Sequence, residues 1–288
     1  MSNRDWSLVF FTTLAQWSAG TILWLSWPVI HNPGLSSIYH TGLSLQNPVL
    51  LALILIGSAT LSSFLHLGKP VNAPRALSNL SGSWLSREIL SIGAFSLSLV
   101  VTVILGWKTG YPGLQKYLVV LGSISGVALL WTMTRVYTVP TIPPWNNWNT
   151  PVSFVSTTLV LGLLTLLLLH AGGSIQIADH ILRVFWIVLV SILLVEIISA
   201  VTHQFRLATM VQGMDKLVFH KGLFYRVFIF RLAILIFISQ LVVILFVKPD
   251  LLPGYSDSTW LTLIFILAIA QEMTGRLLFY SSYFRIGV

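Results

Sequence analysis

The segment SSFLHLGKPVNAPRALSNLSGSWLSRE, residues 62–88, is polar and separates two long apolar runs in the first half of the chain. Several apolar runs in this sequence exceed the roughly 18 residues expected of a membrane-spanning helix. In hydrocarbon every backbone N–H and C=O needs a partner within the protein, which leaves helices or a closed β-barrel. The runs are continuous and do not alternate with polar residues, which excludes the barrel. The sequence therefore predicts an all-α, polytopic membrane protein.

The composition agrees with this fold class and limits the chemistry. The chain is 56% hydrophobic and 8% charged, and its mean hydropathy is +0.87, whereas soluble domains carry about 25% charged residues. There are no cysteines, so this chain forms no disulfide and ligates no iron–sulfur cluster. Any such cluster that works with this chain belongs to a partner.

The apolar runs and the prolines between them predict eight transmembrane helices in a single membrane domain, residues 1–288. The expected helices cover residues 7–30, 48–66, 87–107, 117–137, 151–172, 181–203, 223–247 and 259–282. The segment Met133–Arg135 resembles Met273–Arg276. This similarity would be explained if the chain consisted of two related four-helix halves. Chance would explain it equally well.

Eight helices place both termini on one face, called face A here, together with loops 67–86, 138–150 and 204–222. Face A receives 12 of the 16 basic residues and five of the eight acidic ones, a net charge of +7 against +1 on the opposite face. By the positive-inside rule alone, face A is cytoplasmic.

Apart from Arg183 near the opposite boundary, the notable ionisable residues of the predicted helices lie in the half of the membrane next to face A. They are His66, Glu88, Arg135, Glu196, His203, Arg231, Glu272 and Arg276. A proton pump or proton-coupled carrier needs such groups at the midplane or through the full thickness. Chemistry at one face is therefore favoured over a stand-alone transporter, in which Gly122, Gly126 or Gly162 would mark a broken helix.

Several of these residues have structural interpretations. Glu272 and Arg276 are spaced to neutralise each other on one helix, and we expect Arg231 to pair with Glu196 or Glu272. Arg135 can extend to the membrane interface. His203 lies near the predicted end of its helix, which is typical of a capped or solvated histidine.

His66 and Glu88 point to a quinol site, because two helix ends and their connecting loop converge on them. Gly68 and Pro70 end one helix, and Ser83 is placed to cap the next, leaving Glu88 near its positive end. Quinol oxidation requires acceptors for two ring protons, and a histidine and a carboxylate supply them. Haem is disfavoured, since only His66 and His203 share a depth in the bundle. Both residues are also common at membrane boundaries, so a structural role stays open.

Five segments give the sequence a family resemblance. They are LAQWSAG (14–20), SSFLHLGKPVNAPRALSNL (62–80), LSREI (85–89), MTRVYTVPTIPPW (133–145) and QEMTGRLLFY (271–280). Together with the length and the eight-helix layout, they make the protein similar to the membrane anchor subunit of the dimethyl-sulfoxide reductase family of molybdoenzymes.

The resemblance implies a complex with a molybdopterin catalytic subunit and an iron–sulfur subunit, in anaerobic respiration. It implies an anchor that binds and oxidises menaquinol or another quinol, contains no haem or other metal, and passes electrons to the iron–sulfur partner. His66 and Glu88 match the residues tied to quinol binding. The quinol-binding set is Ser63, His66, Gly68, Lys69, Arg75, Trp84, Arg87 and Glu88, supported by Arg135, Tyr137, Glu272 and Arg276.

The resemblance also bears on orientation and direction. It implies a bacterial or archaeal cytoplasmic membrane with face A, and both termini, at the periplasm, against the charge count. Docking of an acidic partner would explain the positive face. The terminal substrate stays open, and so does the reverse direction, quinone reduction as in a polysulfide-reductase type of anchor.

Overall fold

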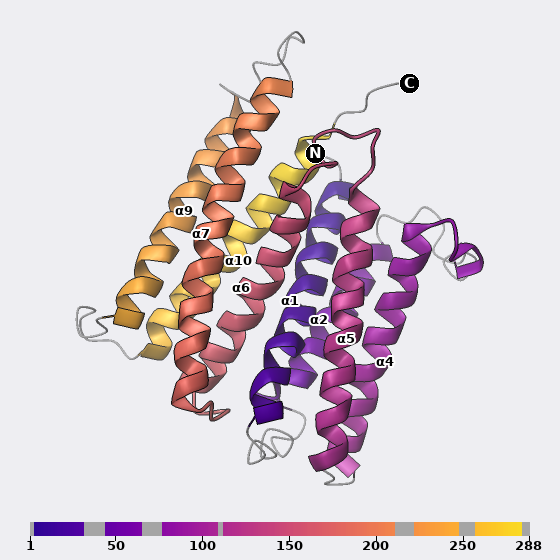
Figure 1. Ribbon diagram of the computed structural model, residues 1–288, viewed down its shortest axis with the longest axis vertical. Coiled ribbons are helices and arrows are strands. Elements are labelled where there is room, and N and C mark those ends of the chain that lie inside the picture. The colour runs from indigo at the N-terminus through magenta and orange to yellow at the C-terminus, as the bar shows by residue number, and fades with distance from the viewer. Residues whose placement is uncertain are drawn as a thin grey trace.

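The computed structural model describes residues 3–31, 44–64, 77–108, 112–210, 222–247 and 257–283, and this part of the protein is entirely helical (Figure 1). Its helices are α1 (Asn3–His31), α2 (Pro48–Phe64), the 3-10 helix η3 (Leu77–Asn79), α4 (Trp84–Lys108), α5 (Pro112–Tyr137), α6 (Asn149–Ala171), α7 (Asp179–Met210), α9 (Leu223–Val247) and α10 (Asp257–Ser281). Seven α-helices are long and apolar enough to cross a membrane, and α2 is a shorter apolar helix. The all-α prediction is confirmed for the described residues.

Two helix boundaries differ most from expectation. Helix α5 begins at Pro112 rather than at residue 117, because proline is well tolerated in the first turn of a helix. Helix α7 was expected to end at His203 but continues to Met210. Residues 204–210 include polar side chains but neither Gly nor Pro, so nothing in the backbone stops the helix there.

Helix α1 lies at the centre of the molecule and packs against α2, α5, α6 and α10 (Figure 1). Its closest approach is to α6, where Gly20 faces Gly162. A Cβ built on Gly162 would lie 2.7 Å from Gly20 Cα, and one built on Gly20 would lie 2.8 Å from the carbonyl carbon of Thr158. The two backbones therefore touch, as small residues allow in membrane helices.

Hydrogen bonds between helices fix the position of α1. The Trp17 indole N–H donates to Thr165 Oγ1 at 2.7 Å, and the Trp24 N–H donates to the Leu159 carbonyl at 2.9 Å, both on α6. Ser18 Oγ donates to the Ala52 carbonyl of α2 at 2.6 Å. These bonds satisfy polar groups that would otherwise face hydrocarbon.

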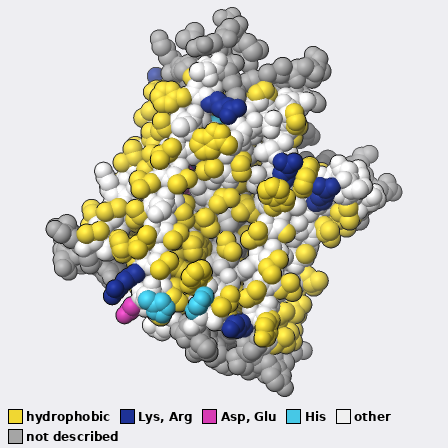
Figure 2. All heavy atoms as spheres, in the orientation of Figure 1, with side chains coloured by type: hydrophobic (Ala, Val, Ile, Leu, Met, Phe, Trp, Pro, Cys, Tyr) yellow, Lys and Arg dark blue, Asp and Glu magenta, His cyan; other side chains and the backbone are white. Residues whose placement is uncertain are grey.

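The start of α1 and the end of α10 lie at the same end of the molecule (Figure 1), which is face A as defined above. Apolar side chains dominate the middle of the visible surface, and the visible charged and histidine side chains gather toward its two ends (Figure 2). The buried charged residues of the described ranges, Glu88, Glu196, Arg231, Glu272 and Arg276, all lie in the half next to face A.

Candidate functional site

Glu88 is a buried carboxylate just over one turn into α4. Ser83 Oγ accepts a hydrogen bond from the Ser86 N–H at 3.3 Å, so Ser83 caps this helix as expected. Glu88 is 4% exposed, and its Oε1 accepts no hydrogen bond from the residues that the structure describes. Because burying a polar oxygen without a hydrogen bond is costly, this oxygen is suited to a donor supplied by a ligand.

An aromatic cluster of Tyr137, Trp145, Phe154, Phe279 and Tyr280 lies beside Glu88. The rings of Tyr137 and Tyr280 are 5.5 Å apart, and those of Trp145 and Phe279 are stacked at 5.1 Å. The Tyr280 hydroxyl donates to Thr12 Oγ1 at 3.4 Å, and both tyrosines lie within electrostatic range of Glu88. The predicted supporting residue Tyr137 thus lies in the same region of the bundle as Glu88, together with Tyr280.

Trp84, Arg87 and Arg135 come together at the face A ends of α4 and α5. The guanidinium carbon of Arg87 lies 4.2 Å from the centre of the Trp84 ring, and that of Arg135 lies 5.0 Å from it. Arg87 also donates to the carbonyls of Leu80 and Ser81 at 2.8 and 2.7 Å. Its guanidinium therefore holds the backbone that leads into α4, besides lying near the candidate site.

The other half of the expected quinol site lies outside the described residues. His66, Gly68, Lys69 and Arg75 belong to residues 65–76, so their placement beside Glu88 stays a prediction. The described part of α2 packs against α4, and near its end Ser63 Oγ donates to the Thr60 carbonyl at 2.7 Å. In the described ranges, no three His, Asp or Glu side chains are grouped to hold a metal ion.

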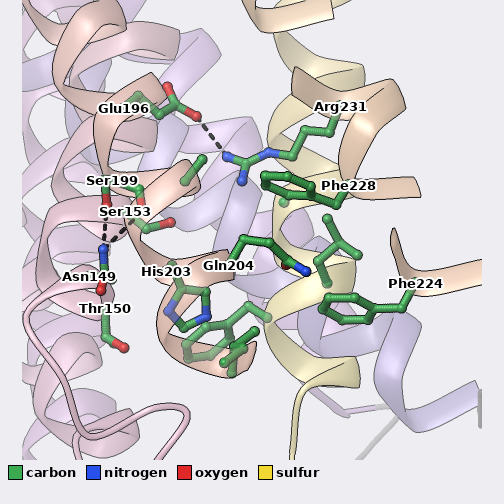
Figure 3. Close-up of a pocket in the computed structure, with 15 residues that line it drawn as sticks. Asn149, Thr150, Ser153, Glu196, Ser199, His203, Gln204, Phe224, Phe228 and Arg231 are labelled. Atoms are coloured by element: carbon green, nitrogen blue, oxygen red, sulfur yellow. Dashed lines mark hydrogen bonds and ion pairs between the residues drawn. The ribbon is translucent and has the colours of Figure 1, made fainter. Parts of the chain in front are cut away.

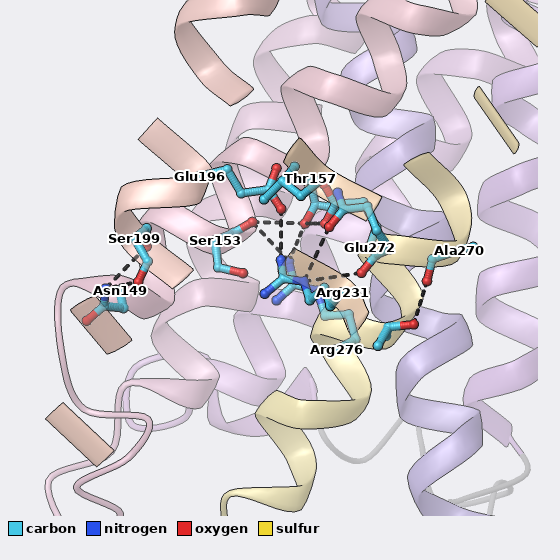
Figure 4. Close-up of polar contacts among 12 residues, drawn as sticks. Asn149, Ser153, Thr157, Glu196, Ser199, Arg231, Ala270, Glu272 and Arg276 are labelled. Carbon is cyan, nitrogen blue, oxygen red and sulfur yellow. Dashed lines mark hydrogen bonds and ion pairs between the residues drawn. The ribbon is translucent and has the colours of Figure 1, made fainter. Parts of the chain in front are cut away.

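Arg276 is the centre of a buried polar network that joins α1, α6 and α10 (Figure 4). It is 1% exposed, and its Nη2 donates to Gln16 Oε1 at 2.7 Å and to Thr157 Oγ1 at 2.8 Å. Thr157 Oγ1 also donates to Glu272 Oε2 at 2.7 Å. Glu272 and Arg276 are thus linked through a hydroxyl of another helix, in place of the direct pair that their spacing suggested.

Arg231 forms the ion pair expected of it. Its Nη2 lies 2.8 Å from Glu196 Oε1, and its Nε donates to the carbonyl and side-chain oxygens of Gln271 at 3.3 Å. Gly275 makes room for it, because a Cβ there would lie 2.6 Å from Arg231 Cζ. The pair is buried and neutral as a whole, which supports a structural role.

A pocket with a cavity volume of about 50 Å³, partly open to the surroundings, lies between α6, α7, α9 and α10 (Figure 3). Its polar wall includes Asn149, Glu196 and His203, and its apolar wall includes Phe228 and Phe279. His203 was expected near a helix end, but it lies two turns inside α7, and its Nδ1 is buried without a partner among the described residues. The pocket was not predicted, because no local motif marks residues brought together from four helices.

Comparisons with known proteins place this sequence in a family. The family model for the DMSO reductase anchor subunit (DmsC) matches residues 1–282. A component of the anaerobic dimethyl sulfoxide reductase of Escherichia coli is 27% identical, over 99% of the present sequence and 97% of that protein. The protein of the same name from Haemophilus influenzae is 32% identical, over 55% of the present sequence and 56% of its own.

A more distant relative has a different name. It is a component of the sulfite dehydrogenase of Allochromatium vinosum, and it is 28% identical over 54% of the present sequence and 50% of its own. The whole-length family match and the apolar helices lead to one conclusion: this is an integral membrane protein that belongs to the DMSO reductase anchor subunit (DmsC) family.

Proposed function

We propose that this anchor binds quinol at face A and oxidises it, and that Glu88 accepts one of the ring protons. The observation that carries the proposal is the buried Glu88 carboxylate, whose Oε1 lacks a hydrogen-bond partner among the described residues, at one end of a membrane bundle. A quinol hydroxyl is a donor that fits such an oxygen, and a positioned carboxylate is a suitable general base.

The proposed reaction converts one quinol to a quinone and releases two protons and two electrons. Glu88 takes one proton and His66 takes the other, while the packed rings of Tyr137 and Tyr280 support the carboxylate side of the site. Lys69, Arg75 and Arg87 would shape the entrance, and Trp84 would form a wall of the site. The electrons leave for an iron–sulfur cluster, which a partner must supply because this protein has no cysteine.

The family supports the proposed partners and location. Anchors of the DmsC type work with a molybdopterin catalytic subunit and an iron–sulfur subunit, and we propose the same assembly here. In this arrangement eight helices cross a bacterial or archaeal cytoplasmic membrane as a single domain, and face A meets the iron–sulfur partner at the periplasm. The excess of basic residues on face A suits a partner with an acidic surface.

The proposal is tested with Glu88→Gln in the assembled complex. Removing a general base slows a reaction by about 100-fold or more, so quinol-linked turnover should fall by that factor. Turnover driven by a soluble dye that reduces the iron–sulfur partner directly should be unchanged. Asp179→Asn, at the opposite end of the bundle, is the matched control. Normal quinol-linked turnover in Glu88→Gln would contradict the assignment.

The second candidate function is the reverse reaction, quinone reduction. It is supported by the relative named for sulfite dehydrogenase, since a dehydrogenase oxidises its substrate and must pass the electrons on. The same residues would then donate protons to the ring. A transporter is less well supported, because the buried charges of the described ranges lie near one face and do not span the bundle. Assaying the complex with quinol plus an acceptor, and then with quinone plus a donor, separates the two directions.

A further inference from the structure

We propose that the pocket between α6, α7, α9 and α10 is a second binding site, for a neutral ring carrying oxygen atoms, the head-group class that includes quinones and quinols. This goes beyond the function proposed above, which places the redox reaction at Glu88. The pocket lies in the half of the bundle next to face A, since Asn149 begins α6 and Phe224 lies in the first turn of α9. From Phe224 to Arg231 it extends roughly 10 Å along α9.

The charges in the wall favour a neutral ligand. Glu196 and Arg231 are the acidic and basic residues in the lining, and they form an ion pair of 2.8 Å. The wall therefore has no net charge. A charged head group would enter this partly dehydrated space without a counter-charge, which is unfavourable.

The polar wall offers hydrogen bonds that the described protein leaves unmade. Asn149 Oδ1, His203 Nδ1 and Glu196 Oε2 are buried and have no partner there, although these residues line the pocket (Figure 3). Asn149 is held in place by its amide nitrogen, which donates to the Ser199 carbonyl at 2.9 Å. Its Oδ1 can accept a hydroxyl proton, and His203 can donate or accept, depending on its tautomer.

The apolar wall of the pocket contains three aromatic side chains, which suit a flat ring. Phe224 and Phe228 follow each other by one turn on α9 (Figure 3), and Phe279 contributes a third ring from α10. Aromatic faces stack on planar rings at about 4.5–7 Å between centres. A ring held there would share the pocket with the polar side chains of Asn149 and His203.

Phe279 also separates this pocket from Glu88. One side of the residue lines the pocket, while its ring packs against Tyr137 and Tyr280 at 5.7 and 5.3 Å. Both tyrosines lie within electrostatic range of Glu88. Phe279 and then the two tyrosines thus lie between the pocket and Glu88, so the two sites would be neighbouring but distinct.

The test counts binding sites in the full-length protein purified with the subunits that accompany it. The probe is a fluorescent hydroxyquinoline N-oxide, a quinol analogue, followed by quenching. We expect two sites per anchor in the wild type and one in Ala200→Trp, whose indole would fill the pocket. His203→Leu should weaken the same site about tenfold, the loss expected for one buried hydrogen bond. Ala208→Trp, on the same helix outside the lining, should keep both sites.

The outcomes distinguish this proposal from the redox assignment. If Ala200→Trp and His203→Leu bind the probe as the wild type does, the pocket proposal is overturned. The same holds if a single site exists and only Glu88→Gln removes it. If instead Ala200→Trp removes a site and Glu88→Gln removes none, the pocket stands and Glu88 is not the quinol site. The melting temperature of Ala200→Trp, compared with that of Ala208→Trp, shows whether it has folded.

Discussion

The segment Gln271–Arg276 of α10 shows how single residues stabilise buried charges in this bundle. Gln271 accepts from Arg231, Glu272 accepts from Thr157, and Arg276 donates to Gln16. Each contact reaches a different helix, so two arginines and two carboxylates are held within a low-dielectric interior by neighbours from α1, α6, α7 and α9.

Replacing Gly275 tests how far the Arg231–Glu196 ion pair depends on this segment. Gly275→Ala would put a Cβ 2.6 Å from Arg231 Cζ, so the Arg231 guanidinium must shift, and we expect the shift to weaken its bonds to Glu196 and Gln271. Losing a hydrogen bond to a charged group costs about 1.5–3 kcal/mol, so we expect the free energy of unfolding to fall by that amount. Denaturant unfolding of the purified protein measures it.

Gly57→Ala is the matched control for this change. Gly57 is also in a helix, but a Cβ there meets nothing within 4 Å. Because alanine is a better helix former than glycine by about 0.5–1 kcal/mol, the control should be neutral or slightly stabilising. Equal unfolding of the two variants would mean that Arg231 does not depend on Gly275.

Sequence reasoning reached some of these residues and not others, for physical reasons. The Arg231–Glu196 pair was expected because unpaired charges are rare in membrane helices. Thr157, which lies between Glu272 and Arg276, was not, since its position depends on how α6 packs against α10. The helix end predicted at His203 is wrong, because α7 continues to Met210. Helix type follows from local composition, but contacts between distant segments do not.

Among the helices, α1 is the element that holds the fold together. Four residues of its segment Leu14–Gly20 contact other helices. Gln16 reaches Arg276, Trp17 reaches Thr165, Ser18 reaches Ala52, and Gly20 touches α6. Small and hydrogen-bonding residues are what membrane helices use to associate, so this segment sets the position of α1 between α2, α6 and α10.

Gly162→Ala tests the α1–α6 contact. The new Cβ would lie 2.7 Å from Gly20 Cα, and a backbone atom cannot rotate away as a side chain can. The helices must separate, so we expect a loss of stability at or above the upper end of the range of about 1–3 kcal/mol for overpacking. Thermal unfolding in detergent measures the loss. Gly93→Ala in α4, where a Cβ meets nothing within 4 Å, should unfold as the wild type does.

For the whole molecule, two physical arguments give opposite orientations, and labelling decides between them. The sequence assigns 12 of the 16 basic residues to face A, and the positive-inside rule would then retain this face in the cytoplasm. The proposed assembly places the same face at the periplasm, where an acidic partner would meet its charge. The protein has no cysteine, so single cysteines can be read without background.

We expect Tyr283→Cys, just beyond α10 on face A, to react with a membrane-impermeant maleimide in intact cells that express the anchor alone. Gln176→Cys, between α6 and α7 on the opposite face, should react only after the membrane is opened. Co-expression of the soluble subunits should reduce labelling of Tyr283→Cys if they dock on face A, and leave Gln176→Cys unchanged. The reverse pattern in intact cells would place face A in the cytoplasm. The basic residues would then reflect membrane insertion, and a periplasmic partner would have to dock on a face that carries little charge.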